Sequence, residues 1–326
     1  MKRYANRFHG CRVQEFVWRG HQLITLENQK IKVGVLASKG ADIIEFRYKP
    51  RDLDVLWHAP QSLLPGEYIP TVARDQGAFL DYYSGGWQEI FPSAGPAAQV
   101  MGASQGQHGE VALLPWDVAV VCDREDRIEV EFTVETVRTP FRLIRRMILE
   151  KDSSVLRLEE KFTNLGFQTI PFAWGHHPAF GAPFLEPGCV IELPRGEGFS
   201  SGANVPGPED KSERVGVYSK FSEGWCALRN PAQELAVGLV WDRQTFPYLW
   251  IWQVYGGAKD YPYYNRTYNL ALEPFNCPFK PMPECIAEGL LPEITAGASL
   301  DTELECGIYE VNKPVISLAQ GGQIRG

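Results

Sequence analysis

The sequence of 326 residues predicts an all-β fold, either a sandwich or a barrel. Many short segments alternate apolar and polar residues with a period of two, as half-buried strands do. Gly, Pro, Asn and Asp residues separate these segments at close spacing. No long segment has the spacing and caps of an amphipathic helix, so alternating βαβ units are not expected.

The expected strands run along most of the chain. They span residues 23–28, 31–36, 41–48, 128–134 (IEVEFTV), 155–163 (VLRLEEKFT), 234–241 and 268–275. Two stretches rich in Gly, Pro and polar residues, 59–110 and 195–217, are expected to be long loops. Neither resembles an interdomain linker, and no internal repeat appears, so we expect a single domain over residues 1–326.

Composition argues against several classes of partner. The net charge is −8, whereas binding to a phosphate backbone requires a basic face. No stretch reaches the roughly 20 apolar residues needed to cross a bilayer, and the first residues lack the apolar core of a signal peptide. The seven cysteines show no CxxC spacing, which disfavours a zinc site and a disulfide framework. We therefore expect a cytoplasmic protein with reduced thiols and no nucleic-acid or membrane partner.

Aromatic residues are frequent: nine Trp, 13 Tyr and 17 Phe make up 12% of the chain. Large aromatic side chains commonly fill buried cores. Flat rings also suit the apolar faces of sugars, so some of them are candidates for the wall of a cleft. Composition favours the core interpretation and leaves the other open.

One acidic side chain lies in a markedly apolar segment. The segment LALEPFNCP, residues 270–278, places Glu273 just before a proline. Burial would raise the pKa of this carboxyl and make it a better base near neutral pH. Alternatively, the period of two turns Glu273 away from Leu270 and Leu272, toward water.

Three histidines are candidates for proton transfer. His176 and His177 are adjacent in WGHHPAF, residues 174–180, and neighbours in an extended segment point in opposite directions. At most one of them can therefore enter a given pocket, and a purely structural role for both remains open. His108 lies in QHGEVALLPW, residues 107–116, where the preceding polar residues suggest the mouth of a loop.

A metal site is the rival chemistry, since His108, Glu110, His176 and His177 are all candidate ligands. The sequence contains no HxH, HExxH or clustered acidic spacing, so no metal is expected. Glycine-rich phosphate loops are also absent, so a nucleotide cofactor is not expected.

Five segments form one pattern along the chain: GGWQEIFPSAG at 85–95, HGEVALLPW at 108–116, GHHPAFGAPF at 175–184, FPYLWIWQ at 246–253 and LALEPFNCP at 270–278. Together they resemble the aldose 1-epimerase (galactose mutarotase-like) superfamily. Superfamily members show matching segments in the same order. The resemblance spans about residues 30–310 and implies one large antiparallel β-sandwich, the supersandwich, with sugar bound in a cleft on its concave face.

The resemblance also implies roles for particular side chains. His177 matches the general acid, Glu273 the general base, and His108 a histidine that holds the sugar near its ring oxygen. Mutual attraction is expected to raise the pKa of His177 and to lower that of Glu273. Further candidates are Trp87, Trp174 and Trp252 for the walls of the sugar site, and Gln88, Glu89 and Gln253 for recognition of hydroxyl groups.

The implied activity is interconversion of the α and β anomers of an aldose by acid–base ring opening, without a metal or organic cofactor. A non-catalytic carbohydrate-binding protein on the same fold remains open, as does a different reaction of a sugar using the same pair. Phosphosugar mutarotases tend to carry Arg just before the paired glycines, where this chain has Tyr83 and Ser84. Arg74 or Arg266 could replace that cation, so a phosphosugar or modified sugar also remains open. The sequence specifies neither the sugar nor the oligomeric state.

Overall fold

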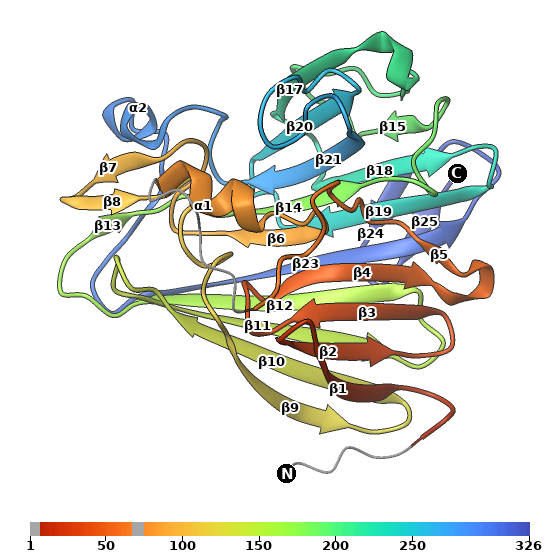
Figure 1. Cartoon of the computed structure of the whole chain (residues 1–326), viewed down its shortest axis with the longest axis horizontal. Coiled ribbons are helices and arrows are strands. Elements are labelled where there is room, and N and C mark those ends of the chain that lie inside the picture. Colours follow the sequence, from red (N-terminus) through yellow and green to blue (C-terminus); the bar gives the residue numbers. More distant parts are fainter. Residues whose placement is uncertain (1–6, 67–74) are drawn as a thin grey trace.

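Two large antiparallel sheets face each other in the computed structural model, which describes residues 7–66 and 75–326 (Figure 1). The ten-stranded sheet has, in spatial order, β1 (Arg12–Trp18), β2 (His21–Glu27), β3 (Ile31–Leu36), β4 (Asp42–Tyr48), β6 (Trp87–Ile90), β14 (Gly175–Phe180), β21 (Tyr268–Phe275), β20 (Tyr248–Tyr255) and β17 (Ser212–Ser219), with β5 (Leu53–Asp54) beside β4. The nine-stranded sheet has, in spatial order, β16 (Ala203–Asn204), β15 (Val190–Glu192), β18 (Trp225–Asn230), β19 (Leu235–Trp241), β23 (Ser299–Glu310), β12 (Val155–Asn164), β11 (Phe141–Glu150), β10 (Arg127–Glu135) and β9 (Asp117–Asp123). The predicted antiparallel β-sandwich is confirmed.

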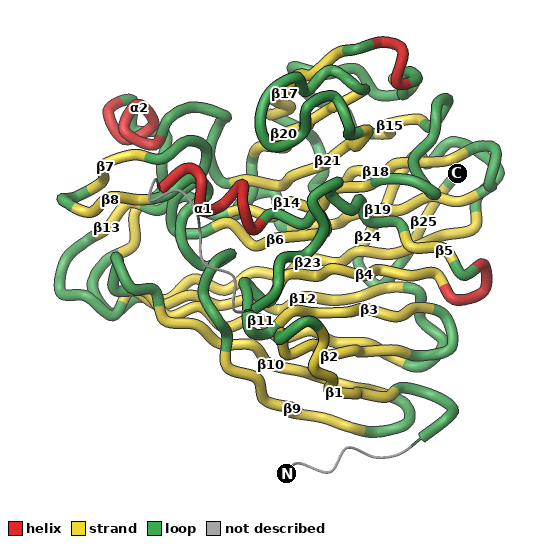
Figure 2. Tube along the Cα trace, viewed as in Figure 1, coloured by secondary structure: helices red, strands yellow, loops and turns green. Residues whose placement is uncertain are grey.

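Short elements complete the described part of the chain. Three two-stranded pairs are β7 (Ala98–Val100) with β8 (Ala103–Gln105), β13 (Ile170–Pro171) with β22 (Glu293–Ile294), and β24 (Ser317–Ala319) with β25 (Gln323–Arg325). The helices are α1 (Asp75–Tyr82), α2 (Met282–Ala287) and the 3₁₀ turns η1 (Lys49–Arg51) and η2 (Pro208–Asp210). Figure 2 shows how small the helical share is beside the strands. Within the described ranges, no helix has the length and apolar character needed to span a membrane.

The seven expected strands are all present as β2, β3, β4, β10, β12, β19 and β21. The expectation of a long loop over residues 59–110 is wrong, because this stretch contains α1, β6, β7 and β8. Strand β6 has four residues, all buried, so it shows no alternation of apolar and polar residues that could reveal it. The other expected loop contains β16 and the start of β17.

Aromatic side chains fill the space between the two sheets. Phe91, Phe141, Phe162, Phe172 and Trp174 form a cluster in which neighbouring ring centroids are 4.6 to 6.3 Å apart. Such spacing is favourable for tilted and edge-to-face contacts. The core interpretation of the aromatic content therefore holds for this cluster.

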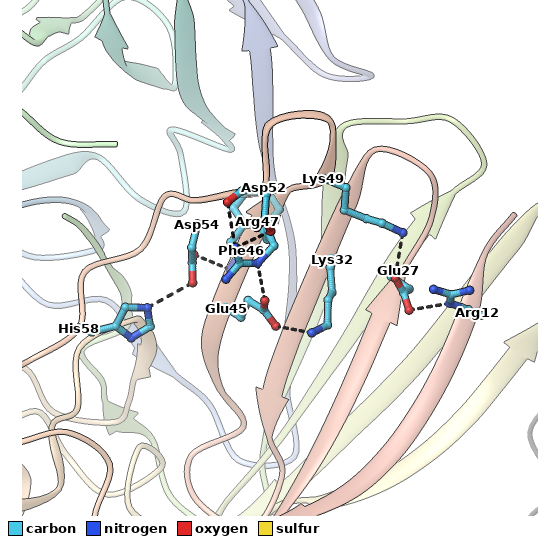
Figure 3. A network of polar contacts seen from close by, with 10 residues as sticks. All are labelled: Arg12, Glu27, Lys32, Glu45, Phe46, Arg47, Lys49, Asp52, Asp54 and His58. Atoms are coloured by element: carbon cyan, nitrogen blue, oxygen red, sulfur yellow. Dashed lines mark hydrogen bonds and ion pairs between the residues drawn. The ribbon is translucent and has the colours of Figure 1, made fainter. Parts of the chain in front are cut away.

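Charged side chains connect the first strands of the ten-stranded sheet (Figure 3). Glu27 pairs with Arg12 and Lys49 at 2.5 and 2.8 Å, and Glu45 pairs with Lys32 at 2.8 Å. Partly exposed pairs of this kind contribute roughly 0–1 kcal/mol each. The residues of this network do not line the cavity over β14, β20 and β21.

Candidate functional site

A cavity of about 520 Å³ lies over the strands β14, β20 and β21, which are neighbours in the ten-stranded sheet. This volume is within the usual range for a small-molecule site. Its lining includes Phe79, Tyr83, His108, His177, Trp252 and Glu273. They come from three strands, from α1 and the residue after it, and from the segment after β8, so residues far apart in the sequence meet at one place.

The histidine and the carboxylate predicted to carry the chemistry meet in this cavity. His177 Nε2 lies 3.5 Å from Glu273 Oε1, and the two residues are 5% and 3% exposed. Strands β14 and β21 pair directly, with Gly175 opposite Phe275. A Cβ atom at Gly175 would collide with the ring of Phe275, so glycine permits this close approach. The close pairing brings an imidazole and a carboxyl group within reach of one substrate atom.

The period of two in β21 turns Glu273 away from Leu270 and Leu272, as expected for a strand, but the side chain does not face bulk water. Leu270 and Leu272 join the core between the sheets, whereas Ala271 and Phe275 join a second apolar cluster on the other face. Glu273 shares that second face, which the cavity and its aromatic walls cover. Its carboxyl group is therefore both buried and open to the cavity.

Burial dominates the electrostatics of the pair. Desolvation raises the pKa of Glu273 well above its ordinary value. Desolvation lowers the pKa of His177 to about 4, and a hydrogen bond to its own main-chain carbonyl acts in the opposite direction. The expectation that mutual attraction sets both values is therefore wrong, because the cost of burying charge is larger. Both shifts favour the uncharged forms, namely the protonated carboxyl group of Glu273 and the neutral imidazole of His177.

His108 also contributes a neutral imidazole to the cavity. Its ring centroid is 5.6 Å from that of His177, and Phe79 contacts it edge-on at 4.7 Å. Burial, followed by the nearby His177, lowers the pKa of His108 to about 3. Its backbone has φ = 60°, which is uncommon for a residue with a side chain, and such strained residues concentrate at functional sites.

His176 points to the opposite side of β14, into a polar cluster between the sheets. His176 Nε2 lies 3.0 Å from Glu160 Oε2, and its Nδ1 accepts a hydrogen bond from Trp87 Nε1 at 3.3 Å. The Trp87 bond requires Nδ1 to be unprotonated, so Nε2 carries the hydrogen that it donates to Glu160. His176 is thus a fully buried structural residue beside the residue that reaches the cavity.

The remaining substrate-site candidates divide between the cavity and the interior. Trp252 lines the cavity, with its rings 5.6 Å from His177 by centroid distance. Trp87, Gln88, Glu89, Trp174 and Gln253 are buried and do not line it. Glu89 accepts hydrogen bonds from Trp174 Nε1 and Arg145 at 2.7 and 3.2 Å, on the same face as His176.

Two glutamines are occupied by other partners. Gln88 shares a register position with His177, but its amide donates to Asp42 and to the Gly85 carbonyl at 3.1 and 2.8 Å. Gln253 lies on the face of β20 opposite Trp252, where Arg214 and Tyr255 donate to its Oε1, both at 3.2 Å. The structure therefore gives neither side chain to the cavity.

The four candidate metal ligands do not converge. His108 and His177 share the cavity, but His176 points away, and Glu110 accepts hydrogen bonds from the main chain of residues 137 and 138. Glu89, Glu160 and His176 do place ligand atoms within 4.8 Å of one another. Arg145 already supplies a cation to this sealed cluster, in contact with Glu89.

Cations suited to a phosphate group are sparse in the described lining. Arg266 donates to the carbonyls of Tyr263 and Pro262 at 3.1 and 3.2 Å and does not line the cavity. Arg74 lies outside the described residues. Lys280 is among the lining residues, and it pairs with Glu288 at 2.7 Å.

Sequence reasoning missed several residues of the site. Phe79, Tyr83 and Tyr263 all line the cavity, and Tyr83 Oη lies 3.2 Å from His177 Nδ1. Tyr83 and Tyr263 lie outside regular strands, so no period of two indicates their direction. The aromatic run at 261–268, YPYYNRTY, and Tyr83, two residues before the paired glycines, were the available signals.

Solved structures with this fold include several proteins named for sugar chemistry. A provisionally named aldose 1-epimerase from Klebsiella pneumoniae subsp. pneumoniae MGH 78578 superposes with a TM-score of 0.80 at 15% identity, covering 96% of this chain and 85% of that one. A galactose mutarotase-like protein from Clostridium acetobutylicum has a TM-score of 0.68 at 13% identity, covering 93% and 99%. One from Lactobacillus casei ATCC 334 has a TM-score of 0.59 at 18% identity, covering 88% and 100%. The fold is therefore that of the galactose mutarotase-like sandwich, as the sequence motifs predicted.

Sequence comparison assigns the family. No curated protein matches the sequence. Residues 18–308 match the family described as "Domain of unknown function (DUF4432)". Because this match covers most of the chain and includes every strand that builds the cavity, the chain belongs to that family.

Proposed function

We propose that the chain is an aldose 1-epimerase that interconverts the α and β anomers of a free aldose. The observation that carries this proposal is the 3.5 Å separation of His177 Nε2 and Glu273 Oε1 at the wall of a ligand-sized cavity. The two oxygens that exchange protons in this reaction are bonded to the same anomeric carbon. An acid and a base that serve them must therefore lie close together, as this pair does.

The reaction needs two proton transfers that move in opposite directions. One group removes the proton of the anomeric hydroxyl while the other protonates the ring oxygen, and the bond from the ring oxygen to C1 breaks. C1 becomes an aldehyde carbon, rotation about C1–C2 exposes its other face, and the reverse transfers close the ring. Each well-placed acid or base contributes a factor of about 10²–10⁴.

The pair can serve both ring opening and ring closure while His177 Nε2 and Glu273 hold one proton between them. From the neutral state, His177 Nε2 takes the hydroxyl proton while the protonated Glu273 gives its proton to the ring oxygen. Ring closure returns both protons and restores the starting state. The opposite assignment, with Glu273 as base and His177 as acid, holds the same number of protons. The assignment implied by the resemblance is thus one direction of a reversible cycle.

Aromatic and neutral polar groups support binding of the sugar. Trp252 is a candidate platform for an apolar sugar face, and the neutral His108 can hydrogen-bond a hydroxyl or the ring oxygen. Glu213 and Asp260 line the cavity together with Lys280, so the described lining favours an uncharged sugar over a phosphorylated one.

Exchange spectroscopy of anomeric protons tests the proposal on a panel of neutral, deoxy and phosphorylated aldoses. We expect the native protein to accelerate exchange for at least one neutral aldose and Glu273→Gln to lose at least about 10²-fold of that acceleration. Glu223→Gln, at an exposed glutamate, is the matched control and should behave as the native protein. Binding without acceleration of any sugar would favour the carbohydrate-binding protein instead.

A further inference from the structure

The two ring nitrogens of His177 have different surroundings. Nε2 faces Glu273 at 3.5 Å, and Nδ1 lies 3.2 Å from the hydroxyl oxygen of Tyr83. For Nε2 both to accept and to release a proton, Nδ1 must keep its own hydrogen throughout the cycle. A buried Nδ1–H group needs an acceptor, because leaving it unpaired costs about 1–3 kcal/mol. Besides the hydrogen bond of the ring to its own main-chain carbonyl, the Tyr83 hydroxyl oxygen stands at hydrogen-bond distance from Nδ1 and can accept this hydrogen.

Tyr83 is held rigidly where that acceptor is required. It is 2% exposed and directly follows α1 and Tyr82. Its ring meets the His177 ring edge-on, with centroids 5.3 Å apart and planes at 80°, and Phe79 stacks on the Tyr83 ring with centroids 5.3 Å apart. Its main-chain carbonyl accepts a hydrogen bond from Gln61 Nε2 at 3.0 Å. Both the ring and the backbone of this tyrosine are therefore fixed.

The chemistry of a phenol suits this position. Burial raises the pKa of Tyr83 well above 10, so its hydroxyl stays neutral. A neutral acceptor orients the imidazole without adding a negative charge, whereas an aspartate there would raise the pKa of His177. This agrees with the pKa of about 4 for His177. The hydroxyl leaves the basicity of the imidazole low while fixing its direction.

We propose that Tyr83 is the positioning residue of the site: its hydroxyl oxygen accepts the Nδ1 hydrogen of His177 and aims Nε2 at Glu273 and the bound sugar. The part concerning sugar rests on the proposed function, whereas the hydrogen bond itself does not. In this arrangement the Nδ1 bond is kept in both the neutral and the protonated imidazole. Proton exchange at Nε2 then requires no rearrangement of the ring.

The tautomer of His177 tests this directly. Long-range ¹H–¹⁵N correlation spectra of histidine-labelled protein at pH 7 distinguish a protonated Nδ1 from a protonated Nε2, with His177→Gln identifying the signals. We expect the Nδ1–H form to predominate in the native protein and to fall below half in Tyr83→Phe. A native protein with hydrogen on Nε2, or a Tyr83→Phe variant with an unchanged tautomer, would overturn the proposal.

Kinetics separate positioning from a merely structural effect. Tyr83→Phe should lower kcat by about 10–100-fold while KM changes by less than about threefold. Tyr218→Phe is the matched control, because Tyr218 is equally buried and its hydroxyl donates to the remote Pro194 carbonyl. It should leave the His177 tautomer and kcat unchanged. If no aldose is a substrate, the tautomer still decides whether Tyr83 fixes the ring. An active enzyme with hydrogen on Nε2 would refute the positioning role and leave the epimerase proposal standing.

Discussion

His176 and His177 are consecutive in β14, yet each faces a carboxyl group on a different side of the strand. His176 Nε2 lies 3.0 Å from Glu160 in the nine-stranded sheet, and His177 Nε2 lies 3.5 Å from Glu273 in the ten-stranded sheet. The first pair is sealed in the interior and the second lines the cavity. One extended dipeptide thus joins the two sheets and supplies the site.

This difference predicts opposite effects for the same substitution. His176→Gln should lower the free energy of unfolding by about 1–3 kcal/mol, because Trp87 and Glu160 would lose their buried hydrogen bonds to the imidazole. Its anomer exchange should stay close to native. His177→Gln should lose exchange with a smaller loss of stability. Urea unfolding and exchange spectroscopy on both variants check this, and loss of exchange in His176→Gln at native stability would contradict it.

The pH dependence of the reaction follows from burial of the pair. The reactive state holds one transferable proton, so the rate should fall when a second proton is added to His177. Because burial lowers the pKa of His177 to about 4, activity should persist well below pH 6. Rates of exchange from pH 3.5 to 9, with the uncatalysed rate subtracted, measure this profile. An acidic limb near the ordinary histidine value of about 6.5 would show that the imidazole is not desolvated during the reaction.

The buried cluster of Glu89, Glu160 and His176 should make the stability of the protein depend on pH. Burial raises the pKa of Glu89 and of Glu160 to about 7. The folded protein therefore keeps protons that the unfolded chain loses near pH 4.5, and this stabilisation is lost as the pH rises from about 4.5 to about 7. Glu160→Gln removes one of these two carboxyl groups and also removes the charge repulsion that Glu160 exerts on Glu89. The free energy by which the native protein is more stable than this variant should therefore decrease between pH 5 and pH 7.

Unfolding by urea at pH 5, 6 and 7 measures that difference. Glu159→Gln, at the neighbouring position on the outward face of β12, is the matched control and should show no such trend. A native advantage that grows with pH would mean that the carboxyl groups of the cluster are ionised in the folded protein.

Much of the fold follows from sequence because the period of two is a direct result of strand geometry. Buried and more exposed residues alternate along the nine residues of β10 and the ten residues of β12, so both strands can be located from the sequence. His177 and Glu273 were candidates because their residue types differ sharply from those around them, and only the resemblance to the superfamily gave them paired roles.

The rest of the site depends on the register between distant segments. Trp87 and Glu89 lie beside the site in sequence, but their strand pairs with β14 so that they share the face of His176 rather than the cavity. Nothing within either segment fixes that register. Tyr83 reaches His177 from the turn after α1, and its direction depends on tertiary packing.

The central claim is that His177 and Glu273 act as one unit on one anomeric carbon. Anomer exchange rates of His177→Gln, Glu273→Gln and the double variant test it most directly. We predict that each single variant loses about 10²–10⁴-fold, and that the double variant stays within about tenfold of the weaker single one, since either change already breaks the proton exchange. Losses that multiply in the double variant, or near-native exchange in either single variant, would contradict this account.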